Sequence, residues 1–582
     1  MVQCVKKHII TIVAASLVLI AVVVTVVVVV TRNKGNGGPK ILTVIKNNEE
    51  LKRPNINLNA EMELVKMDNN MKGLIISDPY ASKFHIQLTM NYGSFIDTIS
   101  GISHFGEHMV LQSCEKYNTL YPFFNAFDSI KNSEFNAETG GIYQTYFIAL
   151  PFNLVYEKAM DMLTEAFRHP LYSPELIKNE TQAVNHEFYE NIKHMERIEH
   201  DMIRLLSKDN ISFNGIGCGN NETLNPSDSE KLSKILKGYH MVIKNPNQIF
   251  FTLYSNKTMS ESEEIAKKYL NYKMHIFPDS EIDDEDKKKL EQNMKDIKNI
   301  ELFDNSLYNH GIYYNSITKS NMLTIYYYIG KIEISKLHFD FIDYINYLLF
   351  SESLLKILRD KNYIIMSYYI VAGRDNIIYD NAYFNIRLKL TENGFNNIND
   401  ILLIINKYID IIKEEGYQEK YFNDFVKYMN NKFILKFNKE KFFSTNSFSY
   451  MAENLEYCSS EEFLFSGKLT KDNYNPELLK NHLERINFNK SFYAVNSKET
   501  VNETYLSGTL KSPQHKKLKY FNADYIIGEI PDDVLTNIKN TSIKINGLKI
   551  RDISPYFSDV YNDTVTPCYK EKENKCKEKK RI

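Results

Sequence analysis

The chain has 582 residues, 25% of them charged, with a formal net charge of −2. This length accommodates two to four domains. The near-zero net charge argues against a nucleic-acid-binding protein that relies on basic charge.

An uncharged segment near the N-terminus, Ile9 to Val30, is dominated by Val, Ile, Leu and Ala. At about 1.5 Å per residue it spans roughly 33 Å as a helix, which is enough to cross a bilayer core. It exceeds the apolar region of about 7–15 residues that a cleaved signal peptide carries. We therefore predict a transmembrane signal anchor over 1–31. Basic residues flank both sides, so the short N-terminal tail favours a type II orientation, with a cleaved signal and secreted form as the alternative.

The segment His104-Phe105-Gly106-Glu107-His108 reads H-x-x-E-H, the inverted zincin order. On a helix, His104 and His108 lie one turn apart on one face. Two imidazoles at that spacing can hold one Zn²⁺ at about 2.0–2.1 Å. Glu107 is placed to take a proton from an activated water. The motif predicts a zinc hydrolase, and a surface helix with two solvated histidines is the alternative.

A second helix is expected to supply the third ligand. Ser173 suits an N-cap and Pro174 suits the first helical position. Glu180 and Glu187 follow seven residues apart and hence on one face. Because a catalytic zinc site has three protein ligands and one open position, we predict Glu187 as the third ligand. Glu180 is predicted to orient a ligand, and two ordinary solvated glutamates are the alternative.

A repeated pattern indicates duplication. Residues 247–258 and 489–500 both read as a strand that leaves a turn and enters a helix start, 242 residues apart. That offset suits two duplicated domains rather than a solenoid. Shifted by it, His104 falls on Asn346 and His108 on Phe350. The second copy is therefore expected to share the fold and lack the metal.

The pattern of elements predicts an α+β fold of two homologous domains, each a mainly antiparallel sheet with helices packed on one face, preceded by one transmembrane helix. The first copy includes a hairpin over 134–150. The second includes strands over 312–317, 323–329, 363–371 and 383–390 and a helix over 398–415. The predicted segments are the anchor 1–31, a tether 32–58, a zinc-bearing peptidase domain 59–276, a charged linker 277–302, an inactive repeat domain 303–560 and a charged tail 561–582.

These motifs resemble the insulysin–pitrilysin family of zinc peptidases, from about residue 60 to about residue 560. The resemblance implies that His104, His108 and Glu187 bind Zn²⁺ and that Glu107 is the general base. The segments that carry it, besides the histidine motif, are Gly73 to Pro79, Asn91 to Phe95, Gly101 to His104 and Glu180 to Glu187.

Asn136 and Ala137, with Thr139, resemble the active-site edge strand of that family. The resemblance implies that an extended peptide binds there as an additional strand through main-chain hydrogen bonds. An ordinary buried strand is the alternative. The repeat domain would then form a wall of the substrate chamber.

The sequence thus predicts a membrane-anchored zinc metalloendopeptidase that hydrolyses short or unfolded peptides. The alternative is a non-catalytic partner or peptide-binding subunit. Large family members close a chamber from about four domains, so we expect a second insulysin-like chain, or self-association, to complete the chamber here. Cys568 and Cys576 could close a small disulfide loop or be free in the charged tail.

Overall fold

The computed structural model describes residues 41–552. The gaps within that span are 52–58, 120, 152–155, 210, 300, 304–305, 317–319, 332–335, 350–351, 372–376, 379–380, 438–472, 500, 502–505 and 522. The predicted membrane anchor and the cysteines of the tail lie outside the described residues. Among the residues described, no helix has the length and apolar character needed to cross a membrane.

The first sheet has seven strands in the order β1-β2-β3-β7-β4-β6-β5. All neighbours pair antiparallel except β3 and β7, which are parallel. Strand β5 forms one edge of this sheet and carries the predicted substrate-binding residues. The strands are β1 (Leu42–Lys46), β2 (Glu61–Met67), β3 (Lys72–Ser77), β4 (Lys83–Met90), β5 (Glu134–Thr139), β6 (Gln144–Pro151) and β7 (Ile249–Ser255).

The second sheet runs β10-β12-β9-β13-β8-β15-β14, with β11 paired to β12. Here β8 and β13 are parallel and the other neighbours are antiparallel. The mixed α+β class with mainly antiparallel sheets is therefore confirmed. The strands are β8 (His310–Asn315), β9 (Met322–Lys331), β10 (Ile364–Val371), β11 (Ile377–Ile378), β12 (Asn381–Leu390), β13 (Ser491–Ser497), β14 (Lys511–Lys517) and β15 (Asp524–Glu529).

The two sheets share one topology. Read from β5 and from β10, each has its single parallel pair in the same place, between the fourth and fifth strands. Strands β7 and β13 are the equivalent fourth strands, and they come from the two segments that the repeated pattern singles out. The duplication read from the sequence thus has a counterpart in strand order, while the predicted domain limits stay a prediction.

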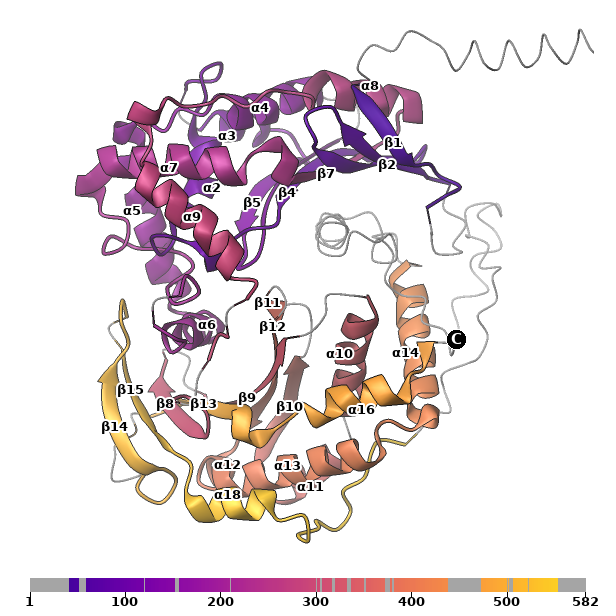
Figure 1. Ribbon diagram of the computed structural model, residues 1–582, viewed down its shortest axis with the longest axis vertical. Coiled ribbons are helices and arrows are strands. Elements are labelled where there is room, and N and C mark those ends of the chain that lie inside the picture. The colour runs from indigo at the N-terminus through magenta and orange to yellow at the C-terminus, as the bar shows by residue number, and fades with distance from the viewer. Residues whose placement is uncertain are drawn as a thin grey trace, which may run out of the picture.

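Helices cover the outer side of each sheet, as Figure 1 shows for α4 and α8 above the first sheet and for α13 and α18 below the second, whereas α6 lies between the two halves. In the first half the helices are α2 (Ile102–Gln112), α3 (Pro122–Phe127), α4 (Tyr156–Arg168), α5 (Pro174–Asn191), α6 (Met195–Leu205), α7 (Ser229–Ile243), α8 (Met259–Tyr269) and α9 (Asp284–Asp296). In the second half they are α10 (Lys336–Leu349), α11 (Glu352–Asp360), α12 (Glu392–Phe395), α13 (Ile398–Glu415), α14 (Glu419–Phe437), α16 (Pro476–Glu484) and α18 (Asp532–Lys539).

The second sheet is buried on both faces. Alternate residues of its strands point opposite ways, so Tyr314 and Tyr326 join the core of the first half, while Tyr313 and Tyr327 join the core beneath α13. Burial of apolar surface, at about 25 cal/mol per Å², therefore stabilises the contact between the halves as well as each half. One hydrophobic core runs from the first sheet into the second.

The charged segment predicted as a linker contains an ordered helix. Helix α9 packs on α7 and buries Leu290 completely, although most of its surface is charged. The sequence pattern missed this helix because Asp, Glu and Lys outnumber the few apolar residues that face inward. Asp283 caps α9 by accepting a hydrogen bond from the Asp286 amide.

Candidate metal centre

Helix α2 carries the H-x-x-E-H motif and is fixed at its first turn by a buried aspartate. Asp97 accepts hydrogen bonds from the amides of Gly101 and Ser103 and from the Ser103 hydroxyl. A carboxylate at a helix N-terminus satisfies amides that lack intrahelical partners and complements the positive end of the helix dipole. Ile102, Phe105 and other apolar residues of α2 are buried, so the opposite side of the helix presents the motif.

The Nδ1 atom of each motif histidine has a hydrogen-bond acceptor of its own, and the Nε2 atom faces the predicted metal position. His104 Nδ1 lies 3.0 Å from the carbonyl oxygen of Cys218. His108 Nδ1 lies 2.7 Å from Oε1 of Glu180, a residue that is 6% exposed. Because a carbonyl or a carboxylate can only accept, each Nδ1 carries a proton, and Nε2 is the ring nitrogen that can serve as a metal ligand. The structure places Glu180 where the sequence predicted a ligand-orienting acid.

The two free nitrogens converge on Glu187. Its Oε2 lies 3.6 Å from His104 Nε2 and 3.4 Å from His108 Nε2. Ligand atoms held at about 2.0–2.1 Å by one tetrahedral ion lie roughly 3.4 Å apart. The distances from Glu187 to the two imidazoles therefore match those expected around a single bound metal ion. The Glu187 side chain is 41% exposed, which leaves one side open to solvent.

The electrostatics of the cluster reflect this convergence. Burial lowers the pKa of His108, but its hydrogen bonds to Glu180 and Glu187 outweigh burial and raise that pKa to about 10. The hydrogen bond from His108 lowers the pKa of Glu187 to about 2, against the effect of burial. Without a metal, a proton on His108 thus occupies the space between the imidazole and the carboxylate. A divalent cation would replace that proton in the same acceptor-rich environment.

Glu107 lies beside this cluster and is held by a neighbouring strand. One ligand atom each of His104, Glu107 and His108 lie within 4.8 Å of one another. Oε2 of Glu107 accepts a 2.6 Å hydrogen bond from the hydroxyl of Thr139, the last residue of β5. The residue is only 7% exposed. A buried carboxylate fixed in this way can exchange a proton with a water in the open position.

Asn136 and Ala137 lie on β5 two to three residues before Thr139. Within the described residues, β5 pairs only with β6, so its other edge presents unpaired backbone groups. Asn136 is exposed and Ala137 half-buried. The strand that carries the predicted substrate-binding residues is therefore the strand that also fixes Glu107.

Two positions that orient His104 were not predicted from the sequence. Gly101 (φ +87°) and Gly219 (φ +82°) both adopt the left-handed region, and a Cβ on Gly101 would lie 2.3 Å from the Gly219 Cα. This close approach brings the Cys218 carbonyl to His104. The glycine-rich run Asn214 to Gly219 was the available signal, but its partner lies more than 100 residues away.

The Cys218 thiol also lies near the cluster, because its sulfur and ligand atoms of His104 and Glu187 are within 4.8 Å of one another. Burial raises the pKa of this thiol and the charge of Glu187 raises it further. The sulfur therefore stays protonated and is a weaker ligand than the two imidazoles.

Helix α6 connects this region to the second half of the chain. Asp201 and Arg204 hold the segment that ends at Cys218, through the Gly217 amide and the Phe213 carbonyl. On the same helix, Glu199 faces the second sheet. It accepts from Tyr314, Tyr326 and Arg387 of that sheet. The structure thus shows a buried ionic contact between the halves, which the sequence did not reveal.

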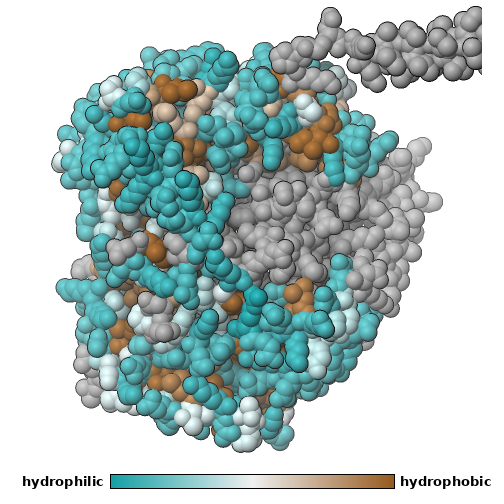
Figure 2. Space-filling model, viewed as in Figure 1, coloured by the Kyte–Doolittle hydropathy of each residue, from teal (hydrophilic) through white to brown (hydrophobic). Residues whose placement is uncertain are grey.

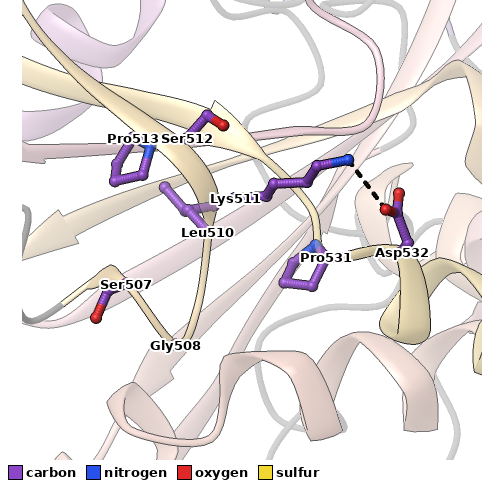
Figure 3. A pocket seen from close by; sticks show the side chains of 8 residues that line it. All are labelled: Ser507, Gly508, Leu510, Lys511, Ser512, Pro513, Pro531 and Asp532. Carbon is purple, nitrogen blue, oxygen red and sulfur yellow. Dashed lines mark hydrogen bonds and ion pairs between the residues drawn. The ribbon is translucent and has the colours of Figure 1, made fainter.

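A separate open pocket lies on the surface of the second half. It has a volume of about 470 Å³ and includes the ion pair between Lys511 and Asp532 (Figure 3). It belongs to the second half and contains no residue of the predicted site. The face in Figure 2 is mostly hydrophilic among described residues, with small scattered hydrophobic patches.

The chain is similar in sequence and in fold to known proteins. Residues 72–214 match the family model Insulinase (Peptidase family M16). The insulin-degrading enzyme of Drosophila melanogaster is 23% identical over 504 residues, covering 83% of this chain and 46% of that enzyme. The chain thus spans about half the length of the curated relatives that it matches.

Solved structures show the same fold. The crystal structure of pitrilysin superposes with a TM-score of 0.74 at 20% identity, covering 89% of this chain and 52% of pitrilysin. An M16-like peptidase from Alicyclobacillus acidocaldarius gives 0.58 at 11% identity, covering 76% of this chain and 99% of that one. The described residues therefore have the two-sheet fold of these solved peptidase structures. These similarities support the resemblance to insulysin–pitrilysin-type peptidases that the sequence motifs predicted.

Proposed function

We propose that the chain is a zinc metalloendopeptidase that hydrolyses short or unfolded peptides. The observation that carries this proposal is the convergence of the two imidazole Nε2 atoms on one Glu187 oxygen, with Glu107 beside them. His104, His108 and Glu187 would hold the zinc ion. When bound, zinc supplies a Lewis acid that activates water and polarises the scissile carbonyl.

The residues of the chain perform the proton transfers and positioning. Glu107 accepts a proton from the attacking water and returns it to the leaving amine. Thr139 keeps one oxygen of that carboxylate occupied and so restricts its rotation. Orientation of this kind contributes strongly to rate, because displacement of a catalytic group by about 1 Å can cost roughly 100-fold.

The free edge of β5 supports an extended substrate. A peptide added there in the antiparallel sense would receive main-chain hydrogen bonds from the segment with Asn136 and Ala137. Its scissile bond would then lie next to Glu107, since Thr139 on the same strand contacts that residue. A folded protein has few free strands to offer, so unfolded or short peptides fit this edge better.

A second candidate is a non-catalytic partner or peptide-binding subunit. The observation that favours it is that the chain spans about half of its curated relatives. The M16-like chain from Alicyclobacillus acidocaldarius supports a shorter unit of this kind, because 76% of the present chain covers 99% of it. We propose that a second insulysin-like chain or a second copy completes the chamber, with the repeat domain as one wall.

For the segment outside the described residues, we propose that Ile9 to Val30 anchors the chain as a single-pass type II membrane protein, with the catalytic part extracytosolic. A secreted form is the alternative.

Zinc analysis and a quenched-peptide assay on the full chain test the proposed function. The wild type should bind about one zinc and cleave an unstructured peptide. Glu107→Gln should keep the zinc and lose cleavage by about 100-fold or more. Glu115→Gln, which changes an exposed glutamate just beyond α2, is the matched control and should leave both unchanged. Zinc binding without cleavage in the wild type, alone and in sized assemblies, would favour the partner role instead.

A further inference from the structure

Lys244 is a buried cation close to the predicted base, and the mechanism above does not use it. It caps the C-terminal end of α7 and has no exposed surface. Within the described part of the chain, no carboxylate forms an ion pair with its ammonium group. Its polar partner is Oε1 of Gln144 at 2.9 Å, and the rings of Tyr146 and Tyr239 lie 5.2 and 5.4 Å from Nζ.

Burying a lysine in this way is unfavourable. Removal of an ammonium from water costs several kcal/mol unless a counter-ion repays it. Burial lowers the pKa of Lys244 to about 7, with the charge of Glu107 acting against that shift. An apolar side chain of similar length would fill the space at lower cost. Residues that violate the rules of core packing in this way concentrate at functional sites.

A directed chain of hydrogen bonds leads from this lysine to Glu107. Lys244 donates to Oε1 of Gln144, whose Nε2 donates to the Ser103 carbonyl at 2.6 Å and to the Thr139 hydroxyl at 3.2 Å. The Thr139 hydroxyl in turn donates to Glu107 at 2.6 Å. Gln144 is completely buried, so water cannot substitute for a missing partner.

Lys244 helps to set the donor-to-acceptor direction of this series of hydrogen bonds. An ammonium can only donate, and a neutral amine still carries N–H groups, so Oε1 of Gln144 must face Lys244. The amide NH₂ then faces Thr139, whose oxygen accepts and whose single hydrogen is left for Glu107. With the Lys244 donor absent, the buried amide oxygen loses its partner, and only the hydrogen bond to the Ser103 carbonyl still holds the amide, so its contact with Thr139 is less well fixed. Thr139 could then direct its hydrogen elsewhere.

We propose that Lys244 is a positioning residue that fixes the general base Glu107 through Gln144 and Thr139. This inference rests on the proposed peptidase function. It adds a residue to the reaction that touches neither substrate nor metal and that lies on α7, outside both ligand helices. The role is to keep the Glu107 carboxylate in one rotamer.

The test compares Lys244→Met, Thr139→Val and the double variant by steady-state peptide cleavage. Loss of one hydrogen bond in a buried chain predicts that K244M lowers kcat about tenfold, with KM changed less than twofold. In the T139V background the same substitution should change kcat less than twofold, because the link is already broken. An equal loss in both backgrounds, or unchanged kcat in K244M, would overturn the proposal.

The stability of the metal-free protein gives a second readout. K244M should melt at the wild-type temperature or above, because an unpaired buried charge is removed. Lys407→Met is the matched control, since Lys407 is also buried but donates to the carbonyls of Ile538 and Asn540. It should lower the melting temperature and leave kcat unchanged. A lowered melting temperature in K244M with unchanged kcat would make Lys244 purely structural and overturn the inference.

A further variant covers poor folding of K244M. Gln144→Glu keeps an acceptor for Lys244 but offers Thr139 no donor. It should therefore lower kcat about tenfold in the wild-type background and change kcat little in the T139V background. An active wild type with unaffected K244M and Q144E would overturn this inference alone. A wild type that binds zinc but cleaves no peptide would overturn the proposed function, and the role of Lys244 with it.

Discussion

Glu180 offers a quantitative test of how His108 is oriented. Its Oε1 accepts from His108 Nδ1 at 2.7 Å, and both groups face away from bulk solvent. Glu180→Ala removes this acceptor and leaves Nδ1–H without a partner in a mostly buried position. A hydrogen bond to a charged group contributes about 1.5–3 kcal/mol, which corresponds to roughly 10–100-fold in an equilibrium constant. Loss of a partner behind a metal-bound histidine has effects of the same size.

We therefore expect Glu180→Ala to weaken zinc binding by about 10–100-fold, measured by competition with a chromophoric chelator at fixed pH. Glu180→Gln keeps an oxygen acceptor and should show a smaller loss. Glu175→Ala, at an exposed position in the first turn of the same helix, is the matched control and should bind zinc like the wild type. Unchanged zinc affinity in Glu180→Ala would refute the reasoning that this carboxylate fixes the imidazole for metal binding.

Three further predictions concern stability. Glu199→Ala should lower the free energy of unfolding in urea by about 3–5 kcal/mol, because Arg387 would stay mostly buried without its partner. The control Glu196→Ala, at an exposed position, should change that free energy by less than about 0.5 kcal/mol. Equal effects of the two variants would contradict the contact between the halves. Gly101→Ala should reduce the melting temperature and zinc occupancy together, because a Cβ there meets the Gly219 backbone; a variant with wild-type occupancy would refute this packing argument. The folded-state pKa of Lys244 is about 7 and that of an unfolded lysine about 10.4, so the unfolded chain binds more protons between these values and wild-type stability rises with pH there. The stability advantage of K244M should thus be largest below pH 7 and shrink toward pH 10, and an advantage independent of pH would contradict the burial of a charge.

Local signals in the sequence predicted much of the fold. Ser173 caps α5 and Pro174 begins it, as the residue types indicated. The helix predicted over 398–415 is α13, which ends before Gly416. The repeated strand pattern corresponds to β7 and β13. These features depend on residues within a few positions of one another, which is the range over which sequence patterns carry information.

The contacts that complete the site were beyond such patterns. His104 meets Cys218 across 114 residues, Lys244 meets Gln144 across 100, and Arg387 meets Glu199 across 188. Each is a wholly or partly buried polar pair that only the tertiary fold brings together. The helix in the charged segment escaped prediction for a different reason, since a single buried Leu290 gives no periodic signal.

The most direct measurement is the zinc content of the purified full chain and of Glu187→Ala, by mass spectrometry after removal of loosely bound metal. The wild type should retain about one zinc per chain and Glu187→Ala much less, while Glu190→Ala, which changes an exposed carboxylate one turn further along α5, should retain it. A Glu187→Ala chain that holds zinc as firmly as the wild type would contradict the three-ligand site on which the proposed hydrolysis depends.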